Sequence, residues 1–144
     1  MVSINWCLNT KNGIEIIDPN DNLANAYIIK AEEALELMQS TQYKDWKISM
    51  AYYSMYYSLY AVLMKIGIKC EIHACTIELM KKFLKDYFSK DEYEFILKAM
   101  GARIDAQYYV NKEVEDEFYS KIIVKPIEFI VKCKSVILKL NEAK

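Results

Sequence analysis

The segment from Asp45 to Ile66 constrains the fold most strongly, because it is long and carries almost no charge on any side. Projected as a helix, it separates an aliphatic face, a stripe of small side chains and a face of tyrosines. The tyrosines on that face are Tyr52, Tyr53, Tyr56, Tyr57 and Tyr60. A helix of this kind is surrounded by partners, either other helices of a bundle or a second subunit. The segment is therefore predicted to be the central helix of an all-α protein.

Apolar residues recur at helical spacing on both sides of this segment, and turn residues are scarce. A sheet protein of 144 residues would need more than the 3 Gly and 2 Pro found here. We predict helices over about residues 18–40, 45–66, 72–88, 89–109 and 114–140. Residues 1–17 are predicted to form an irregular N-terminal arm with a turn at Asn12-Gly13, and residues 1–144 to form a single domain.

Several residues mark where these helices begin and end. Asp18-Pro19 is expected to start the first of them, with Asp18 as the cap. Gly67 is expected to end the central helix in the left-handed conformation. Ser89 and Glu92 have the spacing of a capping box, and Pro126 is expected to kink or restart the last helical region.

The charge balance limits the possible partners. Lys and Arg number 19 against 20 Asp and Glu, so no overall field would hold a polyanion and any nucleic-acid contact must be local. The longest apolar stretch, from Ile48 to Ile68, is interrupted by Lys65 and by tyrosine and serine hydroxyls, so we predict no transmembrane helix. Residues 1–13 lack the pattern of a secretory signal, and we expect a cytoplasmic protein.

The four cysteines are Cys7, Cys70, Cys75 and Cys133, and they show no paired spacing. We therefore predict that they are reduced and mostly serve as small core residues. Cys70, His73 and Cys75 superficially resemble metal ligands. On a helix, however, Cys75 is turned away from the other two, and no fourth ligand is evident. We expect neither a metal nor another cofactor.

Residues 102–110 concentrate polar chemistry near the end of a predicted helix. The residues that stand out are Arg103, Asp105, Gln107, Tyr108 and Tyr109. An arginine can hold a phosphate in two-pronged geometry, and a tyrosine can donate a hydrogen bond or stack on a base. The alternative is that Arg103 pairs with a nearby carboxylate while the two tyrosines pack at the helix end.

His73 and the tyrosine face each have two interpretations. His73, the only histidine, either packs or caps at the start of a helix, or approaches Arg103 and supplies a base. The tyrosines of the central helix either pack inside the protein or at a dimer interface, or line a groove that stacks nucleobases.

In the order of these features the sequence resembles HEPN domains, in particular small stand-alone prokaryotic and archaeal members. The resemblance covers about residues 20–140. It is carried by the tyrosine-rich run 51–61, Gly67, His73 with Thr76, and Arg103 followed by Tyr108-Tyr109. The resemblance implies an antiparallel up-and-down bundle of four to five helices that commonly dimerises and is often encoded beside a minimal nucleotidyltransferase.

Many HEPN relatives carry an Arg-x4-6-His motif that forms a metal-independent RNase centre between two subunits, and some act as toxins of toxin-antitoxin pairs. Arg103 matches the arginine of that motif, but Tyr108 stands five residues later where a histidine is expected. Attack by a 2′-OH needs a group that takes up a proton near neutral pH, whereas an ordinary phenol has a pKa near 10. The family also uses a tyrosine near this motif as an acceptor of nucleotidyl groups, which makes Tyr108 and Tyr109 candidates by position.

We therefore expect a homodimeric HEPN-type protein that acts with a minimal nucleotidyltransferase in a toxin-antitoxin-like or nucleotide- or RNA-linked system. Arg103 and Tyr108 would be the catalytic residues of a degenerate metal-independent endoribonuclease. The phosphate or nucleotide would be bound by Arg103, Asp105, Gln107, Tyr109 and His73. The alternative is a non-catalytic nucleotide-binding or protein-interaction module.

Overall fold

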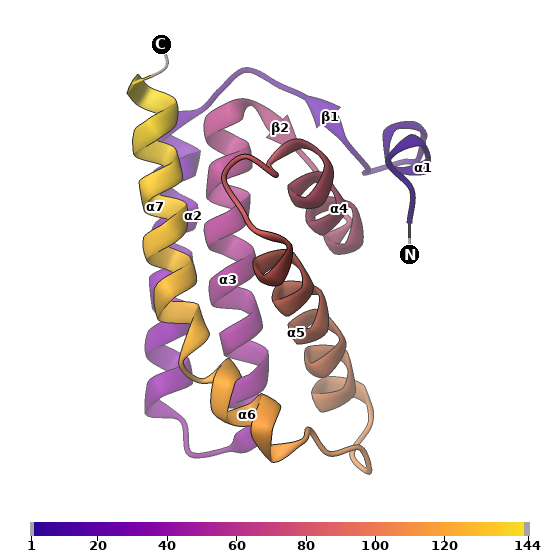
Figure 1. Ribbon diagram of the computed structural model, residues 1–144, viewed down its shortest axis with the longest axis vertical. Helices are drawn as coiled ribbons and strands as arrows, with labels where there is room; N and C mark the ends of the chain where they lie inside the picture. The colour runs from indigo at the N-terminus through magenta and orange to yellow at the C-terminus, as the bar shows by residue number, and fades with distance from the viewer. Residues whose placement is uncertain (1, 143–144) are drawn as a thin grey trace.

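The central helix forms as α3 (Lys44–Ile66), and the computed structural model, which describes residues 2–142, places the other long helices around it (Figure 1). α2 (Asp21–Ser40) runs antiparallel to it, and α5 (Lys90–Tyr108) and α7 (Lys125–Glu142) pack against its other sides. Most α3 side chains are buried, as its lack of charge predicts. The prediction of an all-α up-and-down bundle is confirmed.

The expected helix boundaries hold at two positions. Gly67 follows α3 with φ 103°, and its N–H donates to the Leu63 carbonyl oxygen at 2.8 Å. Ser89 and Glu92 form the capping box at the start of α5, where each side chain accepts from the other residue's backbone N–H. The start of α2 differs from the prediction: Asn20, rather than Asp18, is the cap, because its side chain accepts from the Leu23 N–H.

The shorter helices connect the long ones. α4 (His73–Phe83) ends five residues before the predicted limit at residue 88, and a turn over residues 85–87 leads to α5. The last helical region is divided into α6 (Asp116–Ile122) and α7, with the break just before Pro126. Proline in the first turn of α7 removes only an N–H that would have no helical partner there.

The N-terminal arm is more regular than predicted. It contains α1 (Ile4–Asn9), capped by the Ser3 hydroxyl, and β1 (Glu15–Ile16), which pairs antiparallel with β2 (Ile68–Lys69). The expected turn at Asn12-Gly13 is present, with Asn12 at φ 64°. These elements are too short for apolar periodicity to reveal them.

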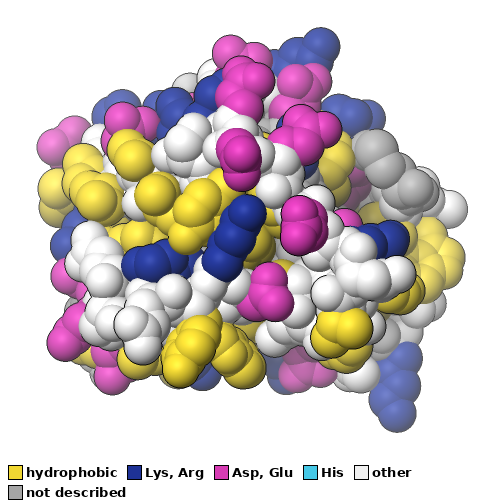
Figure 2. All heavy atoms as spheres, turned by 90° about the horizontal axis from the view of Figure 1, so that it is seen from below, with side chains coloured by type: hydrophobic (Ala, Val, Ile, Leu, Met, Phe, Trp, Pro, Cys, Tyr) yellow, Lys and Arg dark blue, Asp and Glu magenta, His cyan; other side chains and the backbone are white. Residues whose placement is uncertain are grey.

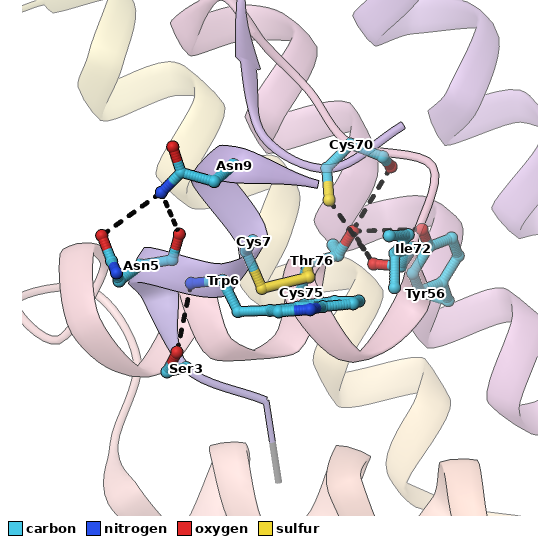
Figure 3. Close-up of a disulfide and its surroundings, with 10 residues drawn as sticks. All are labelled: Ser3, Asn5, Trp6, Cys7, Asn9, Tyr56, Cys70, Ile72, Cys75 and Thr76. Carbon is cyan, nitrogen blue, oxygen red and sulfur yellow. Dashed lines mark hydrogen bonds between the residues drawn. A yellow bond between two sulfur atoms is a disulfide. The ribbon is translucent and has the colours of Figure 1, made fainter. Parts of the chain in front are cut away.

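The prediction that all cysteines are reduced is wrong. Cys7 of α1 and Cys75 of α4 form a disulfide across 68 residues, as Figure 3 shows, while Cys70 and Cys133 are free thiols in the interior. The fold brings the two partners together from distant parts of the chain. Among the described residues, no helix is both long and apolar enough to cross a membrane.

Candidate functional site

Arg103 lies where α5 packs against α3, and its guanidinium group faces two tyrosine rings. The guanidinium carbon is 5.2 Å from the ring centroid of Tyr52 and 5.6 Å from that of Tyr53. These distances are typical of cation-π attraction. On the side toward the C-terminus of α5, Arg103 Nη1 donates to Gln107 Oε1 at 3.0 Å. The arginine is therefore held in place by neutral groups.

The hydrogen-bonding capacity of Arg103 is only partly used. Its Nε is buried without a hydrogen-bond partner, and it forms no ion pair with any carboxylate of the described residues. A guanidinium group has five N–H donors, and an unsatisfied buried donor is costly. The arrangement found here can accept an anion without first breaking an internal salt bridge.

His73 reaches the same cluster from the first position of α4. Its Nδ1 lies 2.8 Å from the Tyr52 hydroxyl oxygen, and its ring stacks on Tyr56 with centroids 3.8 Å apart. Burial, and secondarily the nearby positive charge of Arg103, lower the pKa of His73 from 6.5 to about 4. The imidazole is therefore neutral near neutral pH and is a weaker base than a free histidine.

Tyr52 connects the arginine to the histidine. The side chain is fully buried, and burial, followed by the neighbouring Tyr56 phenol, raises the pKa of Tyr52 far above its ordinary value. The phenol therefore stays protonated, and its hydroxyl shares a hydrogen bond with Nδ1 of the neutral His73 imidazole. The resulting array of Arg103, Tyr52 and His73 positions groups firmly, but it holds no strong base.

A hollow of about 320 Å³ opens one helical turn from Arg103, at the end of the bundle where α3 begins and α5 ends. Figure 2 looks onto this end, where hydrophobic side chains gather in patches among charged ones. The hollow is lined by Asp45, Trp46 and Ser49 of α3 and by Ala106, Gln107 and Tyr108 of α5. Gln107 thus contacts Arg103 and also borders the hollow.

The remaining predicted site residues lie apart from Arg103. Asp105 is 3.5 Å from Lys112 Nζ rather than beside the guanidinium group. Lys112 also lies over the Tyr109 ring, 4.5 Å from its centroid. Tyr108 extends outward and is 71% exposed. The structure therefore brings Arg103, Gln107 and His73 together, leaves Tyr108 at the edge of the hollow, and places Asp105 and Tyr109 around Lys112.

Sequence reasoning did not assign a site role to Trp46 or Ser49, and it named Tyr52 and Tyr53 only as members of a tyrosine face that either packs or stacks nucleobases. The signal was present in α3, because Trp46, Ser49 and Tyr53 follow at intervals of three and four residues and so share one helix face. What the sequence could not show is that this face meets Arg103. Among the described residues, no group of three or more His, Cys, Asp or Glu side chains is arranged to hold a metal ion.

Two comparisons with known proteins agree with this architecture. Residues 22–136 match the model of the HEPN domain family. The chain is also 28% identical over 117 residues to a protein of Methanocaldococcus jannaschii named "Putative toxin MJ0142", a match that covers 78% of each chain. The family match spans most of the sequence, from the second residue of α2 through α3, α4, α5 and α6 into α7. This chain is a member of the HEPN domain family.

Proposed function

We propose that this HEPN protein binds a phosphate group of RNA or of a nucleotide at Arg103 and acts as a toxin-like component of a two-protein system. The observation that carries the proposal is the state of Arg103: it is fixed against Tyr52 and Tyr53, and it forms no ion pair with a described carboxylate, so its positive charge is not neutralised by them. Preorganised arginines of this kind suit phosphate oxygens. The similarity to a protein named as a toxin supports the second part.

The site supports binding better than rapid RNA cleavage. Metal-independent cleavage needs a group that removes the 2′-OH proton, and the pKa of about 4 makes His73 a poor proton acceptor. The His73 Nδ1 is also engaged by the Tyr52 hydroxyl. We therefore propose phosphate binding, rather than catalysis together with Tyr108, as the role of Arg103.

The test uses two matched variants of α5. Arg103→Met removes the charge but keeps an unbranched side chain against the tyrosine rings, and Lys98→Met does the same for a lysine that lies over the Phe118 ring. Binding of a fluorescent single-stranded RNA should weaken roughly tenfold in Arg103→Met and stay unchanged in Lys98→Met. Equal affinities for the two variants would refute the phosphate site. Gel analysis of the same RNA in EDTA measures cleavage separately.

The exposure of Tyr108 favours a second role, as an acceptor of a nucleotidyl group from a minimal nucleotidyltransferase partner. Its phenol oxygen would attack the α-phosphorus of a nucleoside triphosphate, forming an O–P bond while pyrophosphate leaves and the phenol proton passes to a base of the partner or to water. Tyr108 is 71% exposed, whereas Tyr109 is 47% exposed and lies beneath Lys112. After co-expression with such an enzyme, mass spectrometry should find a nucleotidyl mass that Tyr108→Phe abolishes and Tyr109→Phe keeps.

We further propose that the protein is a homodimer. The dimer and its nucleotidyltransferase partner would act in the cytoplasm, where RNA and nucleotides are available. Apolar side chains on the outer face of α7 support self-association, since Ile127, Val131 and Leu138 are between 44% and 62% exposed at helical spacing. Sedimentation equilibrium should give twice the chain mass of 16.9 kDa. A monomer at micromolar concentration would contradict the dimer without affecting the Arg103 site.

A further inference from the structure

The hollow beside Arg103 has an aromatic side chain on each of its two helices. Trp46 of α3 is 56% exposed and Tyr108 of α5 is 71% exposed, so both rings offer accessible faces. Stacking on such rings is the usual way in which proteins hold an unpaired nucleobase. A volume of about 320 Å³ is at the small end of the range for ligand pockets and leaves room for a single base with part of its sugar.

Two polar side chains at the hollow have no hydrogen-bond or ion-pair partner among the described residues. Ser49 is 1% exposed, yet its hydroxyl forms no hydrogen bond with another described residue, unlike Ser54 and Ser58, which donate to backbone carbonyls of α3. The Asp45 carboxylate likewise forms no ion pair or hydrogen bond with a described residue. The Ser49 hydroxyl lines the hollow, so a ligand there can form a hydrogen bond with it.

The chemistry of these groups selects among the bases. An ionised carboxylate only accepts hydrogen bonds, and it has two oxygens side by side. Guanine presents a ring N–H and an exocyclic amino group next to each other, which match the two oxygens of Asp45. Adenine and cytosine each present an amino group beside a ring acceptor, which would face the second carboxylate oxygen unfavourably. Uracil offers one N–H between two carbonyls.

The separation between Arg103 and the hollow fits the length of one nucleotide. Gln107 lies four residues after Arg103 on α5, about 6 Å along the axis, and it both accepts from the guanidinium group and borders the hollow. A ribose spans such a separation between a base and its 5′-phosphate. Gln107 thus connects the guanidinium group of Arg103 to the hollow that Ser49 lines, which suits the phosphate and the base of one ligand.

We propose that this hollow is a guanine-binding subsite, so that the protein recognises a guanosine 5′-phosphate unit, free or within single-stranded RNA. The inference rests on the proposed phosphate site at Arg103 and adds a base preference to it. Trp46 and Tyr108 stack on the base, Asp45 reads its N–H groups, and Ser49 hydrogen-bonds to its edge.

The chain offers a built-in probe, because it contains two tryptophans and Trp6 of α1 can be replaced by Phe. In Trp6→Phe protein the tryptophan fluorescence, excited at a wavelength that tyrosine does not absorb, reports on Trp46 alone. GMP should quench it saturably, with a dissociation constant roughly tenfold below that for AMP. Guanosine, which lacks the phosphate, should also quench it, but at higher concentration.

Two further variants separate this inference from the phosphate site. Asp45→Asn, at an exposed position, should bring the GMP and AMP constants to within about twofold of each other, with circular dichroism confirming the fold. Arg103→Met should weaken the binding of GMP and leave the affinity for guanosine unchanged. Equal affinities for GMP and AMP in protein with Asp45 intact, or no fluorescence response to any guanine compound, would overturn the guanine subsite. If Arg103→Met instead weakens the binding of GMP and of guanosine equally, the phosphate site is refuted.

The same fluorescence assay shows whether the bound guanine belongs to a free nucleotide or to an RNA. Short single-stranded RNAs that begin with 5′-phosphoguanosine or 5′-phosphoadenosine are compared with GMP and AMP. Tighter binding of the guanine-starting RNA than of GMP identifies RNA as the ligand, and tighter binding of GMP identifies the free nucleotide. Calorimetry of Trp46→Leu, with Trp6→Leu as the matched control, should show roughly tenfold weaker GMP binding only in Trp46→Leu.

Discussion

The Tyr52 hydroxyl oxygen lies 2.8 Å from the His73 Nδ1, and this contact joins the central helix α3 to the start of α4. It also places the only histidine of the chain in the electrostatic field of Arg103. The histidine is therefore part of the arginine site but is kept uncharged there. This combination suits a site that orients donors toward an anion rather than one that shuttles protons.

The low pKa of His73 makes the free energy of unfolding depend on pH. Folding lowers the pKa from 6.5 to about 4, so between these values the unfolded chain binds a proton that the folded protein does not. Above about pH 6.5 His73 therefore costs the folded protein no stability. As the pH drops from 6.5 toward 4, the free energy of unfolding decreases. Because His73 is partly exposed, we expect a loss on the order of 1 kcal/mol between pH 7 and 5.5. Urea denaturation at both pH values measures it.

His73→Gln is the control for that loss, since no other histidine titrates in this range. The variant should be less stable than the native protein at pH 7, but its free energy of unfolding should change little between pH 7 and 5.5. An unchanged pH dependence in the variant would mean that the imidazole is not held neutral in the folded state.

The disulfide between Cys7 and Cys75 should contribute strongly to stability. It closes a loop of 68 residues, for which loop-closure entropy gives about 4 kcal/mol. Thermal melting should therefore show a large drop for Cys7→Ser, and dithiothreitol should lower the melting temperature of the native protein but not of the variant. Thiol titration of unfolded, unreduced protein should detect Cys70 and Cys133 alone. Four reactive thiols would contradict the disulfide.

The conformation of Gly67 predicts a contrast between two glycines. A Cβ on Gly67 would lie 2.6 Å from the Ile17 carbonyl oxygen, in addition to the strain at φ 103°. Gly67→Ala should lower the free energy of unfolding by more than about 1 kcal/mol. Gly101 lies within α5, and apart from the neighbouring backbone of that helix no described atom lies within 4 Å of an added Cβ, so Gly101→Ala should raise stability by roughly 0.5–1 kcal/mol. Changes of the same sign in the two variants would contradict this assignment.

Local sequence patterns predicted the helices well and the long-range contacts poorly. The charge-free segment of α3, Gly67 and the Ser89–Glu92 capping box each act within a few residues, so their effects are readable in order along the chain. The Cys7–Cys75 disulfide cannot be predicted in this way, because nothing in the sequence around either cysteine indicates its partner.

The candidate site shows the same division. Arg103 and Gln107 are four residues apart on one helix, and their contact follows from helical geometry. The approach of Arg103 to Tyr52 and Tyr53 depends on how α5 crosses α3, and the hollow at Trp46 depends on where both helices end. These features follow from tertiary packing, which a single sequence does not reveal.

The salt dependence of RNA binding tests the phosphate role of Arg103 most directly. Each phosphate contact to single-stranded nucleic acid contributes about 0.7 to the slope of log affinity against log salt concentration. The slope should therefore decrease in magnitude by about 0.7 in Arg103→Met and stay at the native value in Lys98→Met. Identical slopes for the native protein and Arg103→Met would contradict the account, because they would show that the guanidinium group beside Tyr52 and Tyr53 does not contact a phosphate.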